Sequence, residues 1–132
     1  VSNVAADFPR RAREDGRFYV RDFTLAELKT LSVRERMDME GNPDYPDRFP
    51  GKSGSFRIHT LAEEIELVQG LNVSAGRVAG IYPEIKRPAW HKAEGVDIAP
   101  LMLAVLDEYG YRDASESVFV QCFDADEVKR LR

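Results

Sequence analysis

The sequence predicts an α/β fold in which parallel strands alternate with helices, and three observations support it. From Arg57 onward, helical and extended patterns follow one another in the order helix, strand, helix, strand, helix, which is typical of βαβ units. A length of 132 residues suits one domain rather than two. The combined share of Leu, Ile, Val and Phe exceeds the ~20% typical of disordered chains, so a folded core is expected.

The charge balance and the cysteine content exclude several classes of protein. The net charge is −4, and the acidic excess lies in residues 61–132, which argues against a general nucleic-acid binder. No apolar run approaches the ~20 residues that a membrane span needs. The single cysteine, Cys122, rules out an intrachain disulfide and a cysteine-rich zinc site.

Residues 1–57 are expected to be an irregular insertion between core elements. Turn-forming residues are concentrated in 38–54, which predicts surface loop. One short helix is predicted after Thr24, because Thr24 and Glu27 have the spacing of a capping box and leucines follow at helical intervals.

Three helices are predicted within residues 58–132 from the signals at their ends. Thr60 begins the first helix as an N-cap, and apolar residues follow it at helical spacing. Asp97 caps the second helix, over 98–109, which Gly110 can end. Asp124 caps the third helix. At 132 this last helix has no stop signal, and the chain begins without Met, so we expect an internal segment of a longer protein.

Two strands are predicted between these helices, over residues 78–86 and 118–123. A crossover helix separates them, so they are expected to be parallel neighbours. Residues 87–95 are predicted to form a polar loop after the first strand.

Glu84 and Lys86 are the residues best placed for chemistry. Their spacing puts both side chains on one face of the first strand, at its C-terminal end, where parallel α/β folds have their active sites. A carboxylate there can bind a hard cation through oxygen, and an ammonium can bind phosphate. From spacing alone, an ordinary ion pair at a strand end is the more frequent alternative. Pro83 also argues against a central strand, because it cannot donate to the ladder.

Four runs of the sequence resemble the bacterial periplasmic glycerophosphodiester phosphodiesterases. They are Phe-Pro-Gly at 49–51, Phe-Arg-Ile-His-Thr-Leu at 56–61, Gly-Ile-Tyr-Pro-Glu-Ile-Lys at 80–86 and Val-Gln-Cys-Phe-Asp at 120–124. The Tyr-Pro-Glu-Ile-Lys run is the most specific, and the resemblance extends over essentially the whole chain.

This resemblance implies a (β/α)₈ TIM barrel, of which the chain would hold about two βα units, roughly strands four and five, in residues 58–132. It implies metal-dependent hydrolysis of small-molecule glycerophosphodiesters to an alcohol and glycerol 3-phosphate, in a periplasmic or secreted enzyme. The cation is usually Ca²⁺, and Mg²⁺ also accepts oxygen ligands. Glu84 then corresponds to a metal ligand, and Lys86 to a basic residue near the substrate phosphate.

Other motifs of that family have no counterpart in this sequence. The His-Arg-Gly motif, the Glu-x-Asp ligand pair and the following His-Asp are missing, and neither His59 nor His91 has the flanking residues. No catalytic residue is therefore assigned here, and the acid/base histidines are expected upstream of Val1. The chain alone is accordingly expected to be inactive.

Four further residues are weaker candidates for lining the site. Trp90 and His91 follow the Glu84 strand, and a rim position without chemistry is the alternative for them. Gln121 and Phe123 share one face of the second strand, where packing is the alternative. The function also has an alternative: a non-catalytic phosphodiester- or cation-binding protein that keeps the barrel fold. The sequence leaves the alcohol and the oligomeric state open.

Overall fold

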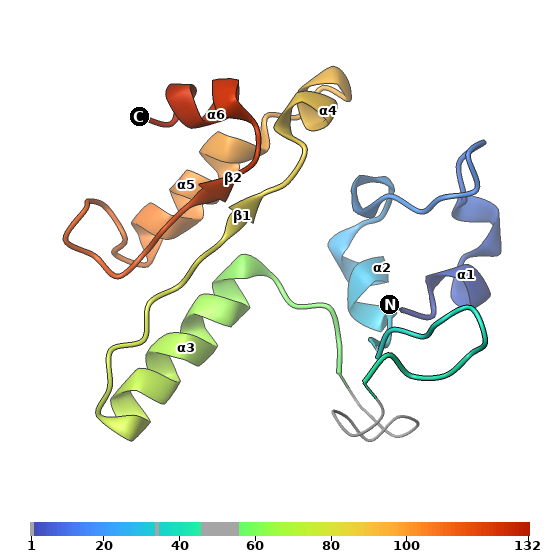
Figure 1. The fold of residues 1–132 in the computed structure, drawn as a ribbon, viewed down its shortest axis with the longest axis horizontal. Coiled ribbons are helices and arrows are strands. Elements are labelled where there is room, and N and C mark those ends of the chain that lie inside the picture. Colours follow the sequence, from blue (N-terminus) through green and yellow to red (C-terminus); the bar gives the residue numbers. More distant parts are fainter. Residues whose placement is uncertain (1, 34, 46–55) are drawn as a thin grey trace. The chain divides into compact units, whose positions relative to one another are not determined.

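The structure is a computed structural model that describes residues 2–33, 35–45 and 56–132 (Figure 1). Two features of the sequence therefore lie outside the described residues: the Phe-Pro-Gly run at 49–51 and residues 46–54 of the loop predicted over 38–54.

Contacts within the chain divide it into two compact units, Val1–His59 and Thr60–Arg132. From the sequence, the boundary between the two parts was predicted between residues 57 and 58. The role of the first part as an insertion in a barrel stays a prediction. Among the described residues, no helix has the length and apolar character that crossing a membrane requires.

The first unit contains only short helical segments. They are α1 (Val4–Asp7), the 3₁₀ turns η1 (Pro9–Arg11) and η2 (Val20–Asp22), and α2 (Leu25–Thr30). The predicted capping box of α2 is confirmed: the Thr24 hydroxyl accepts from the Glu27 N–H at 3.2 Å, and the Glu27 carboxylate accepts from the Thr24 N–H at 2.8 Å. The other three segments were missed, because three or four residues are too few to show a periodicity.

The second unit contains the predicted alternation of helices and strands. Its elements are α3 (Leu61–Ala75), β1 (Glu84–Ile85), α4 (Pro88–Ala93), α5 (Ile98–Glu108), β2 (Gln121–Cys122) and α6 (Ala125–Arg130). The two strands lie side by side and are parallel, as the crossover through α5 predicted (Figure 1). Glu84 pairs with Gln121, and Ile85 with Cys122.

Both strands are shorter than the sequence predicted. Pro83 interrupts the pairing between the two segments before β1 begins. Ile81 forms an isolated parallel bridge with Val118 in the same register as β1 and β2, so the two segments run together over five positions. The Pro83 carbonyl accepts from the Gln121 N–H at 2.9 Å, but Pro83 has no N–H to donate in return. One ladder hydrogen bond is therefore missing between the bridge and the strand pair.

The end signals of the helices are confirmed. The Thr60 hydroxyl accepts from the Glu63 N–H at 3.2 Å, completing the capping box of α3. Asp97 accepts from the Ala99 N–H at the start of α5, and Gly110 follows that helix with a φ of 89°. Only glycine adopts this left-handed backbone without steric cost.

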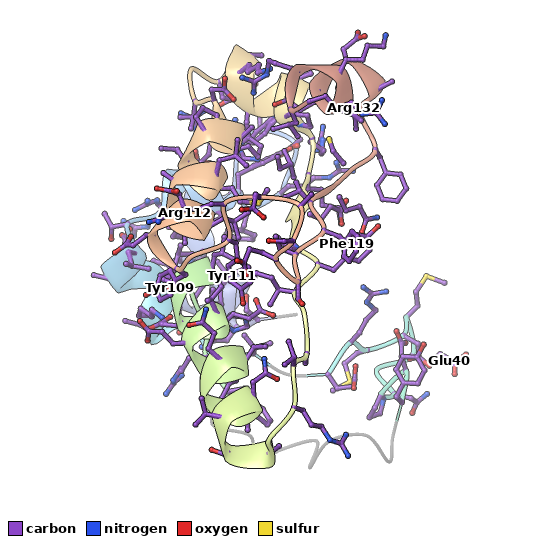
Figure 2. All side chains as sticks on the ribbon, turned by 90° about the vertical axis from the view of Figure 1, so that its left-hand side faces the viewer. Glu40, Tyr109, Tyr111, Arg112, Phe119 and Arg132 are labelled. Carbon is purple, nitrogen blue, oxygen red and sulfur yellow. The ribbon has the colours of Figure 1, made fainter. Side chains whose placement is uncertain are left out.

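One apolar layer joins the strands to α3 and α5. Ile65 of α3, Ile85 of β1 and two residues of α5, Ala99 and Leu106, are buried. At the end of α5 the Tyr109 hydroxyl donates to the Glu66 carboxylate at 2.6 Å, which raises the pKa of Tyr109 to about 12 (Tyr109 is labelled in Figure 2). This hydrogen bond joins α5 to α3, the two helices that contribute buried residues to the layer.

The prediction of a polar loop over 87–95 was wrong, because most of it forms α4. Pro88 occupies the first turn, where its missing N–H is no loss and its fixed φ suits a helix. The alanines at 89 and 93 favour the same conformation. These signals were in the sequence, but the polar residues around them obscured a helix of six residues.

Candidate functional site

Glu84 and Lys86 lie on the same face at the carboxyl end of the first strand. Glu84 is the first residue of β1, and Lys86 directly follows its last. The Lys86 ammonium lies 3.9 Å from the Glu84 carboxylate, a loose ion pair whose lysine is 78% exposed. An exposed pair at this separation contributes little to folding stability. Both side chains are therefore available to a ligand.

A cavity of about 340 Å³ opens beside this pair. Its lining comes from the ends of both strands and the turns that follow them: Glu84, Ile85, Lys86, Arg87, Pro88, Phe123 and Asp124. The parallel register creates this arrangement, because it brings the two carboxyl ends to the same edge of the strand pair.

The two acidic residues of this cavity have different environments. The Asp124 carboxylate accepts from the N–H groups of Asp126 and Glu127, at 3.1 and 3.0 Å, so it is committed to capping α6. Glu84 makes no such bond to the backbone among the described residues and faces only the lysine. Glu84 is therefore the carboxylate of this cavity that can bind a ligand.

The described residues do not form a complete metal site. No cluster of three His, Cys, Asp or Glu residues with suitable geometry occurs in 2–33, 35–45 or 56–132. Glu84 offers at most two oxygens, whereas Ca²⁺ and Mg²⁺ take six or more oxygen ligands in all. This part of the chain could supply one ligand of such a site and no more.

Of the four weaker candidates, Phe123 alone lines the cavity beside the Glu84–Lys86 pair. Phe123 lines the cavity and is 85% exposed. Gln121, opposite Glu84 in β2, is half-buried and is not among the lining residues. Trp90 and His91 are half-buried in α4, with ring centroids 4.7 Å apart, and they are also outside the lining.

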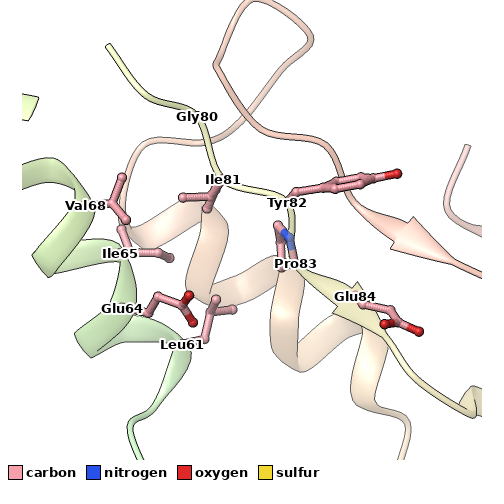
Figure 3. A pocket seen from close by; sticks show the side chains of 9 residues that line it. All are labelled: Leu61, Glu64, Ile65, Val68, Gly80, Ile81, Tyr82, Pro83 and Glu84. Carbon is pink, nitrogen blue, oxygen red and sulfur yellow. The ribbon is translucent and has the colours of Figure 1, made fainter. Parts of the chain in front are cut away.

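A second cavity, of about 370 Å³, lies between α3 and the segment that leads into β1 (Figure 3). Ile81 points toward Ile65 and Val68 of α3, whereas Tyr82 points away from that helix. Most of this lining is apolar, and Glu84 is the residue that it shares with the first cavity, whereas Lys86 lines the first cavity alone. We therefore place the candidate site at the Glu84–Lys86 cavity.

Sequence reasoning missed Arg87 and Asp124 as parts of the site. Arg87 was assigned to a loop, although its place beside Lys86 at a strand end was a usable signal. Asp124 was assigned only to capping, and that role is confirmed. Its proximity to Glu84 depends on strand pairing between residues far apart in the sequence.

Comparisons with known proteins give one consistent result. Residues 4–132 match the glycerophosphoryl diester phosphodiesterase family. The whole chain is 46% identical to a glycerophosphodiester phosphodiesterase of Haemophilus influenzae and 45% identical to one of Treponema pallidum, and it spans 37% and 38% of their lengths. Over 82% of the chain, it is 34% identical to a glycerophosphodiester phosphodiesterase of Arabidopsis thaliana, of which it spans 29%.

Proposed function

This chain belongs to the glycerophosphoryl diester phosphodiesterase family, and we propose that the whole protein containing it hydrolyses glycerophosphodiesters to an alcohol and glycerol 3-phosphate. The observation that supports this most directly is the Glu84–Lys86 pair, which lines a cavity at the carboxyl ends of two parallel strands. Relatives with 45–46% identity over all of this chain carry the name of that activity.

The fold proposed for the whole protein is a (β/α)₈ barrel. Family membership supports it, as does the parallel strand pair joined by a crossover helix. In such a barrel, residues 58–132 would supply roughly strands four and five with their helices, and residues 1–57 an insertion. The exposed side chains Tyr82 and Phe119, which meet edge to face with centroids 6.4 Å apart, would then face the barrel interior.

Lys86 is proposed to bind the substrate phosphate. Its ammonium is a flexible point charge that can leave the loose pair with Glu84 and move onto a phosphate oxygen. There it would stabilise the negative charge that the phosphate carries through the reaction. This role needs an exposed lysine with a weak internal partner, and Lys86 is one.

Glu84 is proposed to be one ligand of a divalent cation, with Ca²⁺ favoured and Mg²⁺ as the alternative. The bound cation would supply charge neutralisation at the phosphate. The remaining ligands, and the histidines proposed for proton transfer, would come from outside the residues described here. A periplasmic or secreted location is proposed with the family.

These roles can be tested with variants of the whole protein. We expect Glu84→Gln to keep the fold but to raise the Ca²⁺ concentration for half-maximal activity roughly tenfold or more, because the amide has no negative charge. Lys86→Met should raise KM for glycerophosphocholine roughly tenfold or more by removing a charged partner of the phosphate. The measurement is release of glycerol 3-phosphate across a Ca²⁺ titration.

Two variants of exposed residues in the same unit control for the loss of charge. Glu116→Gln and Lys129→Met make the same chemical changes outside the cavity, and both should match wild type. Unchanged calcium dependence in Glu84→Gln would remove this residue from the site. A wild-type protein that binds glycerophosphocholine without hydrolysing it would instead establish the non-catalytic alternative.

A further inference from the structure

Arg87 has an unusual backbone conformation at the edge of the candidate site. Its φ is 51° and its ψ 53°, and it is the only residue other than glycine with a positive φ in 2–33, 35–45 and 56–132. Arginine adopts this left-handed region at a steric cost, and the following Pro88 disfavours helical conformations further. Such strain is often found where a side chain has to be placed for function.

Arg87 lines the Glu84 cavity together with its neighbour Lys86. The two cations face two carboxylates there, but Asp124 is committed to capping α6. Glu84 is shared with Lys86 and, under the proposed function, with a cation. The two cations and two carboxylates leave the cavity without net charge, and a divalent cation bound at Glu84 would make it positive, which favours an anion.

The guanidinium of Arg87 has an aromatic neighbour and no carboxylate partner among the described residues. It lies over the ring of Trp90, 5.6 Å from the centroid, which is a cation–π contact. Within the described part of the chain, no carboxylate forms an ion pair with it. A planar guanidinium that lies over an aromatic ring can still donate from its edge to two oxygens of one phosphate group.

We propose that Arg87 is a substrate-binding residue that, together with Lys86, binds the phosphodiester oxygens in this cavity. This inference rests on the proposed function for the identity of the anion. Lys86 acts as a movable point charge, and Arg87 as the planar partner that orients the phosphate. Trp90 contributes by supporting the guanidinium rather than by touching the substrate.

The test compares variants of the whole protein. Arg87→Gly removes the side chain and suits the positive φ, so its fold should be retained. We expect KM to rise roughly tenfold or more with kcat changed less than about twofold, equally for glycerophosphocholine and glycerophosphoserine. Arg87→Lys should recover part of the loss. Arg77→Ala, which removes an exposed arginine outside the cavity, should match wild type.

An unchanged KM in Arg87→Gly would overturn the proposal. A loss confined to glycerophosphoserine would also overturn it, because Arg87 would then bind the headgroup carboxylate instead. Calorimetric titration with glycerol 3-phosphate separates this inference from the proposed function. If the wild-type protein hydrolyses nothing, the proposed function fails, but weaker binding by Arg87→Gly still supports Arg87, and equal binding refutes it.

Discussion

Glu127 is the buried centre of a network that connects three helices. It is 3% exposed, and its carboxylate accepts from the Lys92 ammonium of α4 at 2.6 Å and from the guanidinium of Arg130 within α6. Arg130 also donates to Asp97, the N-cap of α5, at 2.8 Å. These bonds lower the pKa of Glu127 from 4.5 to about 2, the bond from Arg130 being the largest cause and that from Lys92 the next.

This network predicts a pH-dependent loss of stability. Because the pKa is lower in the folded state, the stabilisation from Glu127 is fully present above pH ~4.5 and is lost as the pH falls toward 2. Glu127→Gln should therefore lower the urea midpoint of the whole protein clearly at pH 7, where it leaves Lys92 without its anion. The difference from wild type should shrink between pH 5 and pH 3.

Asp126→Asn is the matched control, because this neighbour in α6 forms only an exposed pair with Lys129. Its urea midpoint should stay close to that of wild type at pH 7 and at pH 3. A Glu127→Gln protein as stable as wild type at pH 7 would show that the network contributes no net stability.

At the scale of elements, the approach of the two strand segments depends on Gly80. A Cβ atom at this position would lie 2.5 Å from the carbonyl oxygen of Ser117, which is backbone and cannot swing away. The same carbonyl accepts from the Ile81 N–H at 2.9 Å and begins the parallel pairing. A side chain at Gly80 would therefore separate the segments where their register starts.

We expect Gly80→Ala to destabilise the protein by roughly 1–3 kcal/mol, the usual cost of overpacking. Gly70→Ala is the opposite case: the site lies within α3, a Cβ would meet nothing within 4 Å, and alanine should stabilise the helix by ~1 kcal/mol. Denaturant unfolding of both variants measures these changes. If Gly80→Ala is as stable as wild type, the close approach to Ser117 does not limit this site.

At the scale of the whole molecule, the strand pair has one covered and one open face. Ile85 is buried on the face toward the helices, whereas Tyr82 and Phe119 on the other are 66% and 73% exposed (Phe119 is labelled in Figure 2). Each strand of the two-stranded sheet also has one unpaired edge within the described residues. Apolar faces and free edges favour association between molecules.

We therefore expect the 132-residue chain, produced alone, to show no phosphodiesterase activity at any Ca²⁺ concentration and to self-associate. The described residues offer no cluster of metal ligands, and neither histidine of the chain has the expected motif around it. Glycerophosphocholine turnover and light scattering are the measurements, with the whole protein as the positive control. Turnover above that of Glu84→Gln would place the catalytic groups within this chain.

Features that depend on neighbours along the chain could be predicted from the sequence alone. The capping residues Thr24, Thr60, Asp97 and Asp124 were predicted because a helix start is fixed by hydrogen bonds between residues two or three positions apart. The shared face of Glu84 and Lys86 followed in the same way from the alternation of side chains along a strand.

Features that join distant segments became visible only in the folded chain. The cavity depends on the pairing of Glu84 with Gln121, and the burial of Glu127 depends on Lys92 of another helix. The left-handed backbone of Arg87 is also not encoded by its own residue type, which disfavours it. Burial, charge pairing and strain of this kind are set by packing between segments far apart in the sequence, so no local pattern could reveal them.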